Sequence, residues 1–143
     1  MATTVHYHPY QGVSAGLAQL PWITASPLSA ELVGHLFYYD RRNAWKRERL
    51  SPLHMYSGGE SLDGRLSMKI LWELRRGSAP ILLDVLAQRI DGTGSSFQQL
   101  PSASSDASQF PSIIDIPTPG CWRLTLKAGA TTSHVVIDVV PGK

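Results

Sequence analysis

The sequence predicts an all-β protein, an antiparallel sandwich of about seven strands, and three observations support this fold class. Residues 121–128 alternate between polar and apolar side chains, which is the two-residue period of a half-buried strand. Residues 133–140 are rich in β-branched side chains and follow a turn signal at 128–130, so they predict an antiparallel partner for that strand. The 12 glycines and 10 prolines, set against 17% charged residues, favour many turns over long helices.

The expected elements begin with an irregular segment. Residues 1–30 are rich in Pro, Gly, Thr, Ser and Ala, and they predict an extended N-terminal arm with Trp22 as its large anchor. Residues 31–143 suit one sandwich domain, because a chain of 143 residues can bury a core without metal or disulfide support. Residues 101–109 are poor in apolar side chains and predict a mobile loop between sheets. Strands are expected at residues 34–39, 53–57, 68–75, 80–90, 110–116, 121–128 and 133–140.

Two of these strands also fit a helix. Within residues 80–90 the apolar side chains recur at helical spacing, and Ser78 and Pro80 form an acceptable helix start. Residues 68–75 alternate as a strand does, yet apolar residues of the segment 62–74 also fall four apart. The strand interpretation is favoured because no other segment has helical spacing, and a helix over 80–90 remains the alternative.

The turn before residues 121–128 carries a resemblance to known domains. The pattern resembles the penultimate strand of bacterial immunoglobulin-like and fibronectin-like modules, in which an aromatic residue packs over the sheet corner; its residues here are Pro119, Gly120, Trp122, Leu124 and Leu126. The resemblance implies an immunoglobulin-like sandwich, with Trp122 where Tyr is usual. Immunoglobulin domains also pair two cysteines across the sheets, and this chain has only Cys121, so that disulfide is absent.

A wider resemblance concerns location and role. Segments 34–39, 69–72, 110–113 and 119–126 together are similar to a group of small exported bacterial proteins, many of lipoprotein type, with no assigned function. The resemblance implies an extracytoplasmic protein, secreted or attached to the cell envelope, that acts as a non-enzymatic binding or structural module. A protein partner or a second copy could join it by strand addition at an uncovered sheet edge.

The N-terminal residues show no export signal. The chain begins Met-Ala-Thr-Thr, without the charged and apolar regions of a signal peptide. We therefore expect that export, if it occurs, used a signal sequence absent from these residues. No apolar run approaches the length that spans a bilayer, so no transmembrane segment is expected.

The strongest charge feature is a basic loop that contains an aromatic residue. Five basic side chains against Glu48 give +4 within nine residues, whereas the whole chain carries +2. Such a loop could bind an anionic partner, although a solvated connection between two strands is the simpler interpretation, and we expect no nucleic acid. The candidate binding residues are Arg41, Arg42, Trp45, Lys46, Arg47 and Arg49.

Histidines are the candidate metal ligands. His6 and His8 share one face of an extended chain, where two imidazoles can chelate copper or zinc. Two ligands do not make a complete site, and spacing does not show whether His35, His54 and His134 converge. We expect no metal and no cofactor, and a small metal or ligand carrier is an alternative function.

Catalytic signatures are weak. The segment Gly12-Val-Ser14-Ala-Gly16 matches the nucleophile elbow of α/β-hydrolases, but no strand precedes it and the chain is too short for that fold. Cys121 points to the face of the predicted strand opposite to that of Trp122, and no motif supplies its thiol with a base. This favours a structural cysteine. The sequence thus predicts a protein that is not an enzyme.

Overall fold

The described part of the chain folds into β-sheets. The computed structural model describes residues 2–10, 15–39, 51–58, 68–75, 82–91, 97–99, 102–103 and 109–142. The all-β prediction is confirmed, because strands dominate these residues and the two helical segments are short: α1 (Ala15–Ala18) and a 3-10 helix (Leu28–Ala30). The strands are β1 (Thr4–Val5), β2 (Trp22–Thr24), β3 (Leu32–Phe37), β4 (Ser51–Pro52), β5 (His54–Tyr56), β6 (Met68–Leu74), β7 (Leu82–Arg89), β8 (Phe97–Gln99), β9 (Ser102–Ala103), β10 (Gln109–Ile114), β11 (Gly120–Ala128) and β12 (Thr131–Val140).

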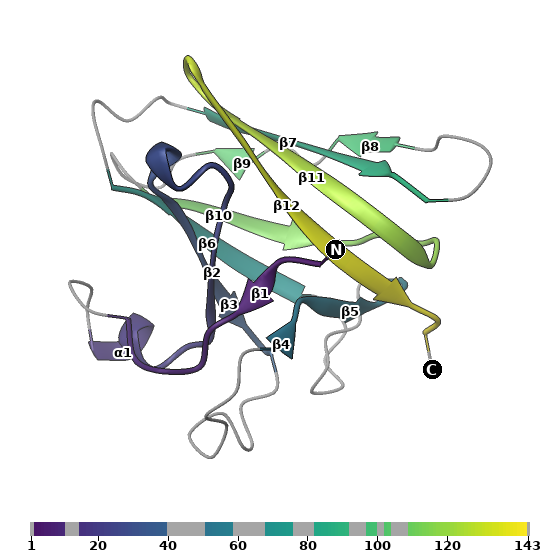
Figure 1. The fold of residues 1–143 in the computed structure, drawn as a ribbon, viewed down its shortest axis with the longest axis horizontal. Helices are drawn as coiled ribbons and strands as arrows, with labels where there is room; N and C mark the ends of the chain where they lie inside the picture. The colour runs from purple at the N-terminus through teal and green to yellow at the C-terminus, as the bar shows by residue number, and fades with distance from the viewer. Residues whose placement is uncertain are drawn as a thin grey trace.

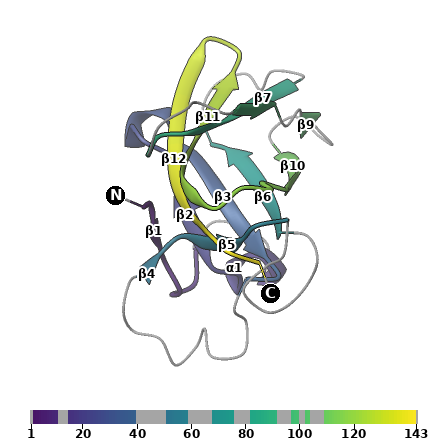
Figure 2. The same cartoon turned by 90° about the vertical axis from the view of Figure 1, so that its right-hand side faces the viewer.

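The strands form two main layers and one small sheet. One layer is a four-stranded sheet in the order β10-β6-β3-β2. The other has the order β5-β12-β11-β7-β8, with β9 also paired to β7, and β1 pairs with β4 separately. Figures 1 and 2 show the two layers, with the hairpin β11–β12 extending beyond their upper end. The architecture is therefore a β-sandwich of mainly antiparallel strands.

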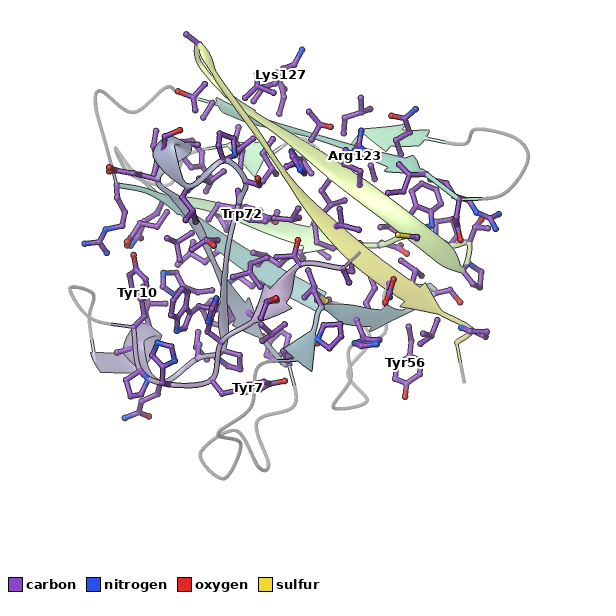
Figure 3. All side chains as sticks on the ribbon, in the orientation of Figure 1. Tyr7, Tyr10, Tyr56, Trp72, Arg123 and Lys127 are labelled. Carbon is purple, nitrogen blue, oxygen red and sulfur yellow. The ribbon has the colours of Figure 1, made fainter. Side chains whose placement is uncertain are left out.

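The core lies between the layers and follows the predicted alternation. Every second residue of β6 is buried, from Met68 to Leu74. Trp72 is fully buried, and Figure 3 shows it between the two layers. In the opposite layer Trp122, Leu124 and Leu126 of β11 point into the same core. One continuous hydrophobic cluster thus joins the sheets, as burial of one face of each layer requires.

A buried hydrogen-bond relay crosses the four-stranded sheet. The indole Nε1 of Trp72 donates to Ser112 Oγ at 2.9 Å, and that hydroxyl donates to the carbonyl of Ile70 at 3.0 Å. Ser112 lies on β10, and the other two residues lie on the adjoining β6. The Ser112 hydroxyl therefore accepts a hydrogen bond from the Trp72 N–H, which would otherwise be buried without a partner.

Replacing Ser112 with alanine should lower the free energy of unfolding by about 1–3 kcal/mol, since the Trp72 N–H would stay buried and unpaired. Ser133→Ala is a matched control, because the Ser133 hydroxyl is buried without a hydrogen-bond partner and its removal should cost little. Urea denaturation of both variants measures the difference. Equal losses would show that the relay contributes nothing.

The turn before β11 is closed by Trp122. This side chain is 2% exposed, and its indole Nε1 donates to the carbonyl of Thr118, four residues upstream, at 2.9 Å. Gly120 between them has a φ of 140°, a conformation that residues with a Cβ rarely adopt. The aromatic ring therefore packs into the core while its N–H fixes the preceding turn.

The seven expected strands all occur, as β3, β5, β6, β7, β10, β11 and β12. The helical alternative for residues 80–90 is wrong, because β7 pairs with β11 from Leu83 opposite Ala128 to Arg89 opposite Trp122. The number of strands exceeds seven since short strands such as β8 and β9 add to them. Within residues 1–30, β1 and β2 join the sheets, and Val5 and Ile23 are fully buried.

The immunoglobulin connectivity is not confirmed. In an immunoglobulin domain the second strand pairs with the fifth, and the third lies in the opposite sheet. Here β3 pairs with β6, which is the next strand of similar length among the described residues. The strand after that, β7, lies in the other sheet beside β11. The likeness is thus one of two-layer architecture.

Candidate functional site

Some of the candidate residues lie outside the part that the structure describes. The basic loop falls there, as does Ser14 of the elbow-like motif. The loop residues concerned are Arg41, Arg42, Trp45, Lys46, Arg47 and Arg49. The histidines and the residues around Cys121 are described, and they can be placed.

His6 and His8 come together on Trp22, the large anchor of the N-terminal arm. The His6 ring stacks on the indole with 4.2 Å between centroids, and the His8 ring meets it edge-on at 5.2 Å. The two imidazole centroids are 5.7 Å apart. Tyr10 adds a third ring to the same indole at 4.7 Å.

A buried histidine continues this cluster. His35 of β3 lies directly opposite Trp22 in the antiparallel pairing of β2 with β3. The ring of Tyr10 contacts it edge-on at 5.6 Å, and the Arg75 guanidinium lies 5.2 Å from the Tyr10 ring centroid. We call these six residues the ring cluster: His6, His8, Tyr10, Trp22, His35 and Arg75.

The N-terminal segment is positioned by backbone bonds to the edge of the sheet. His6 and Trp22 exchange both backbone hydrogen bonds, at 2.9 and 3.0 Å, and the Trp22 indole donates to the carbonyl of His8 at 2.8 Å. Because side chains alternate along an extended chain, Val5 and Tyr7 point into the core while His6, His8 and Tyr10 reach Trp22. Figure 3 shows Tyr10 at the margin of the molecule beside α1, far from Arg123 and Lys127.

His35 is held in its neutral form. Its side chain is fully buried, and neither ring nitrogen has a hydrogen-bond partner. Burial first, and then the positive charge of Arg75, lower the pKa of His35 to about 4. Burial and the neighbouring His8 also lower the pKa of His6. Both imidazoles are therefore uncharged near neutral pH.

The metal interpretation gains no third ligand. Among the described residues, no group of three or more His, Cys, Asp or Glu side chains could hold a metal ion. His54 lies elsewhere, with Nδ1 2.6 Å from the carbonyl oxygen of Pro52, and His134 sits exposed on β12. The five histidines thus do not converge, and the ring cluster is an aromatic packing arrangement with two neutral imidazoles.

Cys121 occupies an electrostatic setting that disfavours a thiolate. Burial, followed by the negative charge of Asp138, raises the pKa of its thiol. Its backbone N–H donates to Asp91 Oδ1 at 2.9 Å, and Arg89 Nε donates to the same oxygen at 3.1 Å. These two bonds lower the pKa of Asp91, the backbone bond contributing most. The Asp91 carboxylate therefore links the end of β7 to the start of β11.

A second candidate surface is the edge of the four-stranded sheet at β10. Ile113 is 58% exposed there, on the face of the sheet that points away from the core. Pairing registers place Phe37 of β3 and Lys69 of β6 in the same row as Ile113. The Lys69 ammonium lies 4.9 Å from the Phe37 ring centroid. The outer face near the edge strand is thus mixed, with the charged Lys69 between the apolar side chains of Ile113 and Phe37.

Comparisons with known proteins found no match: no family model, no curated protein and no solved structure resembles this chain closely enough to assign it. In the part of the chain that the structure describes, no helix has the length and apolar character to cross a membrane.

Sequence reasoning found part of the ring cluster. The two-residue spacing places His6 and His8 on one face, and the same spacing extends to Tyr10. Trp22, His35 and Arg75 were not associated with them from the sequence. Their placement depends on the pairing of β2 with β3 and of β3 with β6, which spacing along the chain does not reveal.

Proposed function

We propose that the chain is a non-enzymatic, extracytoplasmic binding or structural module that associates with a second copy of itself by strand addition at β10. The observation that carries the proposal is an exposed Ile113 on the longest strand at a sheet edge. The extracytoplasmic location is supported by the resemblance of segments such as 34–39 and 119–126 to exported bacterial proteins.

The edges of the two layers differ in length. The strands at the ends of the sheet orders are β10 with six residues, and β2, β5 and β8 with three residues each. Short edge strands offer few backbone groups to another chain, so they are poor templates for pairing. The backbone of β2 is also engaged, since Trp22 exchanges two hydrogen bonds with His6. Among the described edge strands β10 is therefore the longest, and strand addition is best supported at its residues 112–114, because Gln109 and Pro111 already make interactions and β9 lies beside β10.

Pro111 within β10 restricts how a partner strand can pair. Proline lacks an N–H and occurs in sheets mainly on edge strands, so its presence agrees with the position of β10. A partner must find its hydrogen-bond donors at other residues of the strand, which limits the possible registers. Two β10 edges related by a two-fold axis through Ile113 would join their four-stranded sheets and place the two Ile113 side chains opposite each other on one face.

Replacing Ile113 with lysine should abolish self-association, because two charges would be brought into an apolar contact. Sedimentation velocity over a range of protein concentrations measures the oligomeric state. Leu86→Lys is the matched control, since Leu86 is 39% exposed on β7 in the other layer and should tolerate the change. A wild-type protein that stays monomeric, or an Ile113→Lys variant that still associates, would contradict the proposal.

A further inference from the structure

We infer that residues 6–10 form an acid-sensitive strap: uptake of protons by His35 and His6 detaches the strap from the edge of the four-stranded sheet and uncovers Trp22 and β2. The strap and β10 lie at opposite edges of that sheet, so release of the strap does not depend on association at β10.

The described hydrogen bonds of the strap are few compared with those of the sheet ladders, and Tyr7 makes a further interaction. Beyond the two backbone bonds between His6 and Trp22, it makes the indole bond from Trp22 to His8 and a bond from the Tyr10 N–H to the Ala18 carbonyl at 3.2 Å. Segments with few hydrogen bonds at a sheet edge open locally at lower free energy than the core. Tyr7 opposes release because it is buried on the core side, so the strap stays closed near neutral pH.

When the strap is closed, no neighbouring group described around His35 would stabilise a positive charge on its ring. Tyr10 covers its ring from the strap, Trp22 lies opposite it on β2, and Arg75 approaches from the end of β6. The described charged and titratable groups around it are thus cationic or aromatic. Glu73, a carboxylate on the adjoining strand β6, pairs with Arg75 at 3.3 Å. An imidazolium formed there would be buried and unpaired.

His6 contributes in the same direction. Its ring stacks on Trp22, and the titratable group beside it is His8, another potential cation. A charge on His6 would be partly buried and would face His8, so burial and this neighbour disfavour it in the closed strap. Proton uptake by His6 and by His35 is therefore disfavoured in the closed strap. Release of the strap removes this penalty at both residues.

The expected size of the effect follows from His35. An ordinary pKa of 6.5 in the open state against about 4 in the closed state raises the opening constant roughly 25-fold between pH 7.5 and pH 5. Closing of the strap lowers the pKa of His35, so between pH 6.5 and pH 4 the open form binds more protons than the closed form. Acid therefore favours the open form. Protonation of His6 adds to this factor.

Native-state hydrogen exchange on the full chain tests the strap directly. The protection factors of the His6 and Tyr10 amides, corrected for intrinsic exchange, should fall at least roughly 25-fold from pH 7.5 to pH 5. Low urea concentrations should change this exchange much less than exchange on β11, because opening of the strap exposes only part of the surface that global unfolding exposes. Exchange of the strap amides that follows urea as β11 does would mean global unfolding and would overturn the inference.

Three variants assign the effect to the cluster. His35→Phe keeps an aromatic ring without a titrating group and should remove most of the pH dependence. Tyr10→Ala removes the cover over His35 and should also reduce it, and Tyr10 is only half-buried and lies outside the core between the layers. His134→Gln, on the exposed face of β12, should leave the pH dependence intact. Unchanged pH dependence in both cluster variants would overturn the inference.

Discussion

Replacing Trp122 with alanine should lower the free energy of unfolding by about 3–5 kcal/mol, because a large buried aromatic leaves a cavity that the surrounding core fills incompletely. The residue is 2% exposed and belongs to the single core cluster between the two layers. The variant also loses the bond from the indole to the Thr118 carbonyl, which fixes the turn before β11. Chemical denaturation monitored by circular dichroism measures the loss.

The neighbour of Trp122 supplies the control for this experiment. Arg123 lies on the outward face of the same strand, so Arg123→Ala should change stability by less than about 0.5 kcal/mol. Trp122→Phe keeps an aromatic ring but loses the N–H donor and part of the indole volume, so its loss of stability should lie between zero and that of Trp122→Ala. A loss below about 1 kcal/mol for Trp122→Ala would contradict the role of this residue in the core.

The second large effect is a dependence of global stability on pH. The pKa of His35 is lowered to about 4 in the folded protein, against 6.5 when the chain is unfolded. The unfolded chain therefore binds more protons between pH 6.5 and pH 4, and the free energy of unfolding falls as the pH decreases through this window. The full difference of the two values corresponds to about 3 kcal/mol.

His35→Phe isolates this contribution. Urea denaturation of the wild type and the variant at pH 7.5, 6, 5 and 4 measures this difference. On acidification the wild type should lose up to about 3 kcal/mol more than the variant, and the full amount is reached only while the strap stays closed. At neutral pH the variant should be at least as stable, because a buried imidazole without hydrogen-bond partners is replaced by an apolar ring. Parallel pH profiles would show that His35 is solvated in the folded state.

The strands were predictable because their signal is local. Alternation along residues 68–75 and 121–128 places Trp72 and Trp122 on the inward face, and the structure has both faces as expected. The helical spacing of residues 80–90 had offered a helix as the alternative, but this segment forms a strand because β7 pairs with β11. Side-chain period therefore identified most long strands, whereas short strands such as β4, which pairs with β1, depend on neighbours distant in sequence.

Pairing between strands was not predictable from the same signals. A glycine in β3 illustrates why: a Cβ on Gly34 would lie 2.8 Å from Trp72 Cζ3 and 2.9 Å from Ile70 Cγ2, so the close approach of β3 and β6 requires it. The sequence shows a glycine within a strand without showing which side chain fills its place. The resemblance to immunoglobulin-like modules likewise indicated two layers but not the strand order.

The candidate site was visible only in part for the same reason. His6 and His8 share a face because of local spacing, and a metal site was the chemistry that two imidazoles suggested. Their actual neighbour, Trp22, lies opposite His35, so the cluster forms where three segments meet. The same geometry that leaves His35 without a partner makes it sensitive to acid.

Protection of β10 amides against hydrogen exchange, compared between dilute and concentrated wild-type protein, tests most directly the proposal that the chain assembles through this edge. Strand addition predicts that amides of β10 become more protected as the concentration rises, while those of the short edge strands β5 and β8 do not. The Ile113→Lys variant should show no such gain. Protection of β10 that is independent of concentration, or that rises equally at all edges, would contradict the proposal.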